Sequence, residues 1–175
     1  MNQAGSRRLF FALWPDAEVR AQLSAVARRW TRRPVADEKL HMTLIFLGQR
    51  NEQEVACFRQ AASAVQGEPF ELQLDYLGGW PRAGIQWLGG SRVPGELPQL
   101  VKSLTMALQP CGYEAEKRPF VAHITLARRV RRPKVRTDLE AIHWPVRDFA
   151  LVESVSADSG ARYEVLERWA LEKNI

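Results

Sequence analysis

The sequence lacks the motifs by which most metal, nucleotide and redox sites are recognised. Its 175 residues contain no GxGxxG or GxxxxGKS/T phosphate-binding loop, no HExxH pair and no CxxC pair. The only cysteines, Cys57 and Cys111, are too few for a disulfide framework, and their wide separation fits no metal-ligand spacing. These absences count against zinc, P-loop and dithiol chemistry, and they predict reduced thiols in a cytoplasmic protein.

Long apolar runs are also missing. The longest one near the start covers residues 9–14, and Asp16 and Glu18 follow it without a small-residue cleavage signature. We therefore expect no membrane association and no signal peptide. With 46% hydrophobic and 26% charged residues, the composition is that of an ordinary globular chain of about one domain.

Positive charge exceeds negative charge, and it is unevenly distributed. The formal net charge is +5, and arginine supplies most of the 25 cationic residues. Residues 117–136 contain no Asp or Glu but carry a dense group of arginines after position 127. Such a block is typical of an exposed loop that binds a polyanion, although a solvated basic surface explains the composition equally well. No aromatic residue follows Phe120 within the block, so it does not resemble a base-stacking platform.

Apolar periodicity predicts a chain in which strands and helices alternate. Strands are expected over residues 8–14, 41–47, 70–77, 84–88, 121–127, 149–155 and 163–171. Helices are expected after Asp16, after Asn51 with a near-capping box to Glu54, and over residues 96–109. The strand at 70–77 should pair with 84–88 across a turn, and the last two strands should form a hairpin. Several neighbouring strands can pair antiparallel, which favours an α+β fold over a doubly wound parallel sheet.

One tetrapeptide pattern occurs twice, about half a chain apart. His41-Met42-Thr43-Leu44 is repeated as His123-Ile124-Thr125-Leu126. The chain has three histidines and few threonines, so two His-x-Thr pairs by accident have a probability on the order of 0.002. A single His-x-Thr in a strand is usually a structural hydrogen-bonded pair, but the duplication favours a functional site.

Strand geometry predicts how each copy of the motif is oriented. Side chains at i and i+2 share one face of a strand, so each histidine should lie beside its threonine. On the other face, Met42, Leu44 and Phe46 should pack into the core. Two such strands, one from each half, would place two imidazoles across a groove from each other.

This arrangement suits phosphodiester cleavage. Histidine titrates near neutrality and can act as the base for the attacking hydroxyl or as the acid for the leaving oxygen. A threonine hydroxyl can donate to a phosphate oxygen. Arg128 could neutralise phosphate charge, but strict alternation turns it away from His123 unless the strand ends near Ala127.

The other candidate residues have simpler interpretations. His143 has no counterpart in the other half and is expected on the surface or in a loop. Phe10, Phe11, Trp80 and Trp87 are expected in the core, with base stacking by Phe10 or Phe11 as the alternative.

The two motifs and their flanking segments resemble the RNA 2′,3′-cyclic phosphodiesterases of the 2H phosphoesterase superfamily, once described as 2′-5′ RNA ligases. The similar segments are RLFFAL at 8–13, RPF at 118–120 and YEVLERW at 163–169. The resemblance covers about residues 8–171. It departs from the family at Ala122, where relatives often carry proline, and this should alter only the entry into the strand.

The resemblance implies both a fold and a mechanism. The fold would be a two-lobed α+β domain over residues 1–175, with antiparallel sheets, flanking helices and pseudo-twofold symmetry around a cleft. His41 would protonate the leaving 3′ oxygen, and His123 would activate water. Thr43, Thr125 and Arg128 would bind the phosphate, with no metal and no cofactor.

We therefore expect a metal-independent hydrolase of RNA 2′,3′-cyclic phosphate ends that yields 2′-phosphates, with reversible 2′-5′ ligation as a side reaction. A monomer is expected, with RNA or a cyclic nucleotide as its partner. One alternative is a phosphodiesterase for a small nucleotide or ADP-ribose cyclic phosphate. A second is a non-catalytic RNA-binding module. A zinc hydrolase is disfavoured because the cleft offers two histidines and no third ligand.

Overall fold

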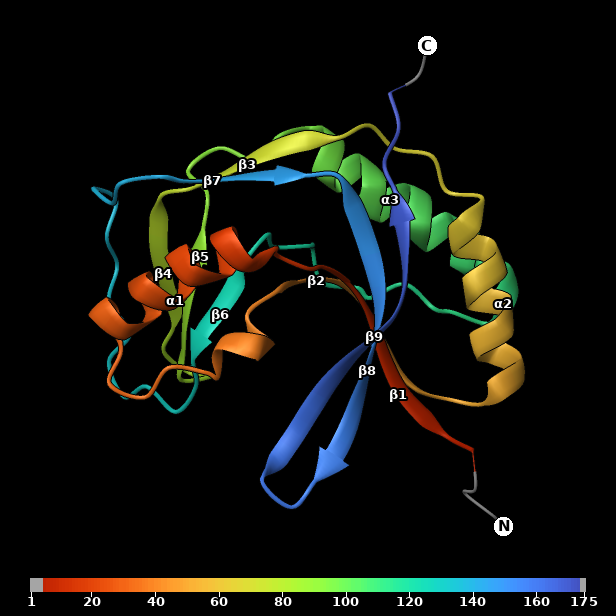
Figure 1. Ribbon diagram of the computed structural model, residues 1–175, viewed down its shortest axis with the longest axis horizontal. Coiled ribbons are helices and arrows are strands. Elements are labelled where there is room, and N and C mark those ends of the chain that lie inside the picture. Colours follow the sequence, from red (N-terminus) through yellow and green to blue (C-terminus); the bar gives the residue numbers. More distant parts are fainter. Residues whose placement is uncertain (1–4, 174–175) are drawn as a thin grey trace.

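The structure is a computed structural model that describes residues 5–173, in which nine strands and three α-helices alternate along the chain (Figure 1). The strands are β1 (Arg7–Leu13), β2 (Met42–Arg50), β3 (Phe70–Leu74), β4 (Tyr76–Trp80), β5 (Ile85–Gly89), β6 (Ile124–Ala127), β7 (Ile142–Val146), β8 (Asp148–Ala157) and β9 (Gly160–Ala170). The helices are α1 (Ala17–Trp30), α2 (Glu52–Ser63) and α3 (Glu96–Leu108), with short 3₁₀ turns η1 (Asp37–Lys39) and η2 (Gln109–Cys111). Among these residues, no helix has the length and apolar character needed to cross a membrane.

Every strand pairing in the described chain is antiparallel, which confirms the α+β prediction. One sheet has the order β2-β1-β8-β9, a second has β4-β5-β6, and β3 pairs with β7. The β8–β9 hairpin predicted from the sequence is present and projects beyond the rest of the chain in Figure 1. The two motif strands, β2 and β6, belong to different sheets, so the histidines that directly precede them lie beside separate sheets.

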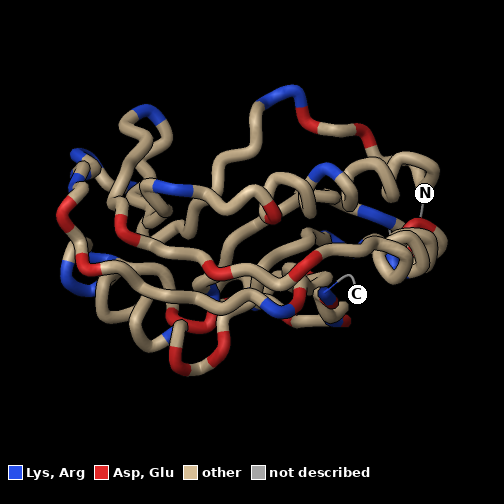
Figure 2. Tube along the Cα trace, turned by 90° about the horizontal axis from the view of Figure 1, so that it is seen from above, with Lys and Arg blue, Asp and Glu red and all other residues tan. Residues whose placement is uncertain are grey.

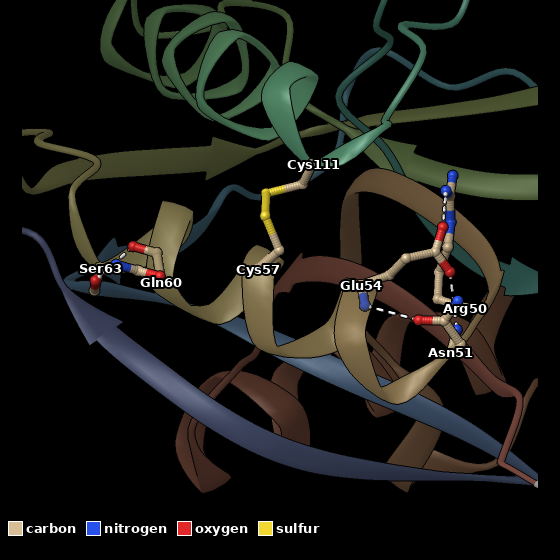
Figure 3. The surroundings of a disulfide bond; sticks show 7 residues. All are labelled: Arg50, Asn51, Glu54, Cys57, Gln60, Ser63 and Cys111. Carbon is tan, nitrogen blue, oxygen red and sulfur yellow. Dashed lines mark hydrogen bonds and ion pairs between the residues drawn. A yellow bond between two sulfur atoms is a disulfide. The ribbon is translucent and has the colours of Figure 1, made fainter.

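Local sequence signals explain where the first two helices begin. The Asp16 carboxylate accepts a hydrogen bond from the Val19 N–H at 2.9 Å, which caps α1. In α2, Asn51 and Glu54 form a complete capping box, drawn in Figure 3. Each helix then buries one apolar stripe in the hydrophobic core, as the helical spacing predicts.

The expectation of two reduced thiols is wrong. Cys57 on α2 and Cys111 in η2 form a disulfide, with their Cα atoms 5.7 Å apart (Figure 3). The sequence could not show this pairing because it depends on how α2 packs beside the end of α3. The bond therefore joins two helical segments that are 54 residues apart in the chain.

The strand predicted over residues 70–77 is two strands with different partners. The break falls at Asp75, whose carboxylate accepts hydrogen bonds from the N–H and the hydroxyl of Ser91. Only β4 pairs with β5, across the predicted turn, whereas β3 pairs with β7. Strand β7 does not follow from the sequence pattern, because Pro145 interrupts its short apolar alternation.

Phe46 does not lie in the core as strict alternation predicts. Its ring is 54% exposed, while Leu44 and Ile45 beside it are both buried. The pairing of β1 with β2 skips Leu44, and this irregularity reverses the alternation beyond it. Phe46 therefore lies on the same side as Phe10, with ring centroids 6.0 Å apart.

Candidate active site

His41 lies directly before β2 and makes two polar contacts. Its Nδ1 is 2.6 Å from the Lys39 carbonyl oxygen, and its Nε2 is 2.9 Å from the Thr43 Oγ1. A carbonyl only accepts hydrogen bonds, so Nδ1 carries the proton in the neutral ring. Nε2 is then the nitrogen that exchanges protons. The contact with Thr43 confirms that these two side chains share a face.

His123 has the corresponding position before β6. Its Nδ1 is 2.8 Å from the carbonyl oxygen of Val121, which is two residues earlier, as Lys39 is in the first copy. Nδ1 again carries the proton, and Nε2 is again the exchanging nitrogen. The repeated tetrapeptide thus builds the same Nδ1–carbonyl contact twice, beside two different sheets.

Aromatic side chains surround both imidazoles, and this does not follow from the sequence pattern. Trp14 stacks on His41 with centroids 5.4 Å apart, and the Phe10 and Tyr163 rings lie at 5.0 and 5.3 Å. On the other side, the rings of Trp80 and Trp87 contact His123, with centroid distances of 4.6 and 6.3 Å.

Of these five aromatic residues, Phe10, Trp80 and Trp87 are the ones that the sequence pattern places in the core. Trp14 follows β1 directly and Trp80 ends β4, so both lie where strands end. Binding residues often lie where a strand gives way to a loop, so their positions at strand ends could have marked Trp14 and Trp80 as candidates.

Burial lowers the pKa of both histidines in the free protein. The pKa of His41 falls from 6.5 to about 4, mainly through desolvation, with Arg20, His123 and Arg128 adding repulsion. The Lys39 carbonyl acts in the opposite direction. The pKa of His123 is also lowered, first by burial and further by Arg128. Both rings are therefore neutral at neutral pH before an anion binds.

The same electrostatic effects indicate that His41, His123 and Arg128 are within electrostatic reach of one another. The charge of His123 acts on His41, and the charge of Arg128 acts on both histidines. The backbone supports this proximity, because the Val35 N–H donates to the Leu126 carbonyl at 2.8 Å. The two halves of the chain thus meet beside the second motif.

Arg128 reaches this neighbourhood because β6 ends at Ala127. Beyond the end of the strand, alternation no longer determines which way a side chain points. Arg129 takes a left-handed conformation with φ of 59°, the only non-glycine residue in the described chain with positive φ. Thr125 lies in β6 opposite Trp87, and Thr43 remains bonded to His41.

His143 lies outside this group, in agreement with its predicted surface position. It is exposed on β7, and its Nδ1 is 2.9 Å from a carboxylate oxygen of Glu71. Within residues 5–173, no three or more His, Cys, Asp or Glu side chains are grouped as ligands for a metal ion.

Comparison with known proteins shows the family to which the chain belongs. The family model of the 2′-5′ RNA ligase superfamily matches residues 15–158. A protein of Escherichia coli K12 named RNA 2′,3′-cyclic phosphodiesterase is 35% identical over 173 residues, which is 94% of this chain and 97% of that protein. A protein of the same name from Thermus thermophilus is also 35% identical, covering 94% of this chain and 90% of its own length.

A solved structure extends the similarity to the fold. The crystal structure of E. coli LigT complexed with 3′-AMP superposes with a TM-score of 0.86 at 32% identity. The match covers 96% of this chain and 99% of that one. The paired motifs, the antiparallel sheets and these matches agree, and the chain belongs to the 2′-5′ RNA ligase superfamily.

Proposed function

We propose that this protein hydrolyses RNA 2′,3′-cyclic phosphate ends to 2′-phosphomonoesters by acid–base catalysis between two histidines. The observation that supports the proposal is that two imidazoles, one from each motif, make the same Nδ1–carbonyl contact and lie within electrostatic reach of Arg128. The names of the E. coli and T. thermophilus relatives support the substrate class. If the 5′ hydroxyl of a second RNA attacked the phosphorus in place of water, the bond to the 3′ oxygen would break in the same way and the two RNAs would be joined through a 2′-5′ bond, as the family name implies.

In the proposed step, His123 Nε2 takes a proton from water as the water oxygen attacks the phosphorus atom. The bond between phosphorus and the 3′ oxygen breaks, and His41 Nε2 donates its proton to that oxygen. The product is a 2′-phosphate beside a free 3′ hydroxyl. The two imidazoles end with their protonation states exchanged, and solvent restores them.

The bound phosphate favours the protonated state that His41 needs. With a pKa of about 4, His41 is mostly neutral in the free protein at neutral pH. A bound phosphodiester brings a negative charge into a buried site and raises the pKa of the neighbouring imidazole. The acid is therefore protonated when the substrate is bound. The surrounding aromatic rings exclude water, which strengthens this effect.

Thr43, Thr125 and Arg128 are proposed to hold the phosphate. The hydroxyl of Thr43 already contacts His41 Nε2, so a phosphate oxygen that it binds would lie beside the acid. Arg128 lowers the pKa of both histidines, and it is therefore placed to offset charge that develops on the phosphorus oxygens.

The decisive test is hydrolysis of an RNA oligonucleotide that ends in a 2′,3′-cyclic phosphate, with end-group analysis of the product. We expect a 2′-phosphate end and the same rate in EDTA, since imidazoles supply the acid and the base. His41→Ala and His123→Ala should each lose on the order of 10²-fold or more in rate and keep the parental melting curve. His143→Ala is the matched control, because this exposed histidine lies outside the site and should keep full activity.

Loss of activity in EDTA that added divalent metal restores would contradict the proposed chemistry, as would near-parental turnover of either cleft variant. The same assay with cyclic mononucleotides and with ADP-ribose cyclic phosphate identifies the preferred substrate. Faster turnover of these small molecules than of RNA would replace the RNA proposal by the small-nucleotide alternative.

We also propose that the protein acts as a monomer in the cytoplasm. The disulfide between Cys57 and Cys111 is the one feature of the described residues that argues for an oxidising compartment, because such bonds are rare in reducing ones. Alkylation of free thiols in intact cells, followed by mass spectrometry of the purified protein, tests the location. Light scattering of the pure protein tests the monomer.

A further inference from the structure

Two segments that are far apart in the sequence form one basic surface that continues from Arg128. The end of α1 and the residues after it carry Arg28, Arg29, Arg32 and Arg33, and all four side chains are exposed. The second segment, residues 129–136, follows Arg128 directly. Figure 2 shows several Lys and Arg segments gathered at the left end of the molecule, the end where α1 stops in Figure 1.

Residues 129–136 carry five exposed cations, which are Arg129, Arg131, Arg132, Lys134 and Arg136. Trp30, the last residue of α1, joins this segment to the helix. Its indole ring lies 5.7 Å from the Lys134 ammonium and 5.2 Å from the Arg136 guanidinium, and Arg29 lies at 5.4 Å. Cation–π contacts thus hold like charges from both segments around one ring.

The second segment is held in place along its length although it forms no long strand. The Val130 N–H donates to the Gly84 carbonyl at 2.9 Å, and Arg136 exchanges two backbone hydrogen bonds with Leu77. Between these points, the buried side chain of Gln86 accepts from the Lys134 N–H and donates to the Lys134 carbonyl, both at 2.8 Å. The cations therefore stand on a fixed backbone, and binding an anion there costs little ordering entropy.

Most of this charge is not neutralised within the protein. Arg28 pairs with Asp37 and Arg136 with Asp138, but Arg32, Arg33, Arg131 and Arg132 have no ion-pair or ring partner among residues 5–173. Holding so many like charges together is unfavourable without a counter-anion. A pre-positioned surface that begins next to Arg128 fits a polyanion whose end enters the cleft.

We propose that this basic surface, the cations of residues 28–33 and 129–136, binds the backbone of single-stranded RNA on the 5′ side of the cyclic phosphate. This inference rests on the proposed function for the identity of the RNA end. A cyclic phosphate is the 3′ terminus of its strand, so the rest of the strand leaves the cleft from the 5′ side. The surface supplies affinity through phosphate charge and not through base contacts.

The test compares two substrates that differ only in length. One is a dinucleotide with a 2′,3′-cyclic phosphate, and the other is an unstructured RNA of about 20 nucleotides with the same 3′ end. The variant replaces Arg32, Arg33, Arg131 and Arg132 with Gln, since these four hold no partner within the described chain whose loss would disturb the fold. The control variant replaces Arg92 and Lys102 with Gln, two exposed cations before and on α3.

We expect the four-site variant to lose about tenfold or more in kcat/KM on the long RNA and to match the parent on the dinucleotide. Each lost phosphate contact lowers the slope of log affinity against log salt by about 0.7, so the slope should fall by up to about 3. The control variant should match the parent on both substrates. Lysine at the same four positions keeps the charge and should restore most of the affinity.

Binding is measured separately, by fluorescence anisotropy of a labelled RNA of about 20 nucleotides that ends in a 2′-phosphate. This readout needs no turnover, so it tests the surface even if the proposed hydrolysis fails. Parental affinity and salt slope in the four-site variant would overturn the inference. Equal loss on the long RNA and the dinucleotide would also overturn it, because the four arginines would then act in the cleft.

Discussion

At the scale of single residues, the two histidines of the cleft share one local geometry but differ in their surroundings. His41 is bonded to Thr43 and packed among three aromatic rings, whereas His123 contacts two tryptophans. The stronger depression of the His41 pKa follows from this denser packing and from its additional exposure to the charges of Arg20 and His123. Because the pKa of both rings is lowered in the ligand-free protein, the pH dependence of the reaction should reflect it.

We expect an acidic optimum for kcat/KM, because the pH dependence of kcat/KM reflects the pKa values of the acid and the base in the free enzyme. Catalysis needs one proton on the pair. Below about pH 4 both rings are protonated and the base is lost, and above the lowered pKa of His123, which lies under its ordinary value, both are neutral and the acid is lost. The maximum should therefore lie between these values, measured by initial rates at limiting substrate. A kcat/KM that stays flat up to about pH 9 would exclude the histidine pair.

The assignment of acid and base is tested by a substrate whose 3′ oxygen is replaced by sulfur. A thiolate leaves with little protonation, so this substrate does not need the acid. His41→Ala should lose on the order of 10²-fold on the oxygen substrate and much less on the sulfur substrate. His123→Ala should be slow on both, because water still needs a base. Rescue of His123→Ala in place of His41→Ala would exchange the two roles.

At the scale of elements, Arg128 owes its position to the end of β6. Since Arg128 lowers the pKa of both histidines, Arg128→Ala should let both values rise. Both limbs of the kcat/KM profile then move to higher pH, while the maximum falls by about 10²-fold as the phosphate loses a donor. Arg92→Ala is the matched control and should change neither. A lower rate with an unmoved profile would place Arg128 away from the imidazoles.

Element prediction from the sequence succeeds where the signal is local. The α1 and α2 caps, the apolar stripes of the helices and the β8–β9 hairpin all depend on residues close in the chain. The pairing of β3 with β7 and the bulge that exposes Phe46 depend on contacts between distant segments, which no local pattern encodes. The repeated motif identified the two histidines because it is a pattern within the sequence. Their aromatic neighbours come from four different strands or strand ends and needed the fold.

At the scale of the whole molecule, the two motif strands lie in separate sheets, and their relative placement determines whether the histidines can cooperate. The hydrogen bond from Val35 to Leu126 and the bridge between Pro34 and Ala127 tie the two halves together next to the second motif. The disulfide joins α2 to η2 instead, and within residues 5–173 neither cysteine contacts a cleft histidine through a hydrogen bond or a ring contact. The disulfide and the two histidines therefore lie at different places in the fold.

The disulfide should accordingly stabilise the protein without affecting turnover. Cross-linking residues 54 positions apart removes chain entropy from the unfolded state, worth about 4 kcal/mol for a loop of this length. Replacing both cysteines with alanine should lower the free energy of unfolding in urea by up to that amount, and dithiothreitol should have the same effect on the parent. The double variant is the control for the reductant, because dithiothreitol has no bond to break in it.

Under native conditions all forms should hydrolyse the cyclic phosphate at the parental rate, since the acid, the base and the phosphate ligands lie on other elements. Equal unfolding curves for parent and variant would show that the bond contributes no stability, and slow turnover by a folded, reduced protein would show that α2 and η2 help position the site.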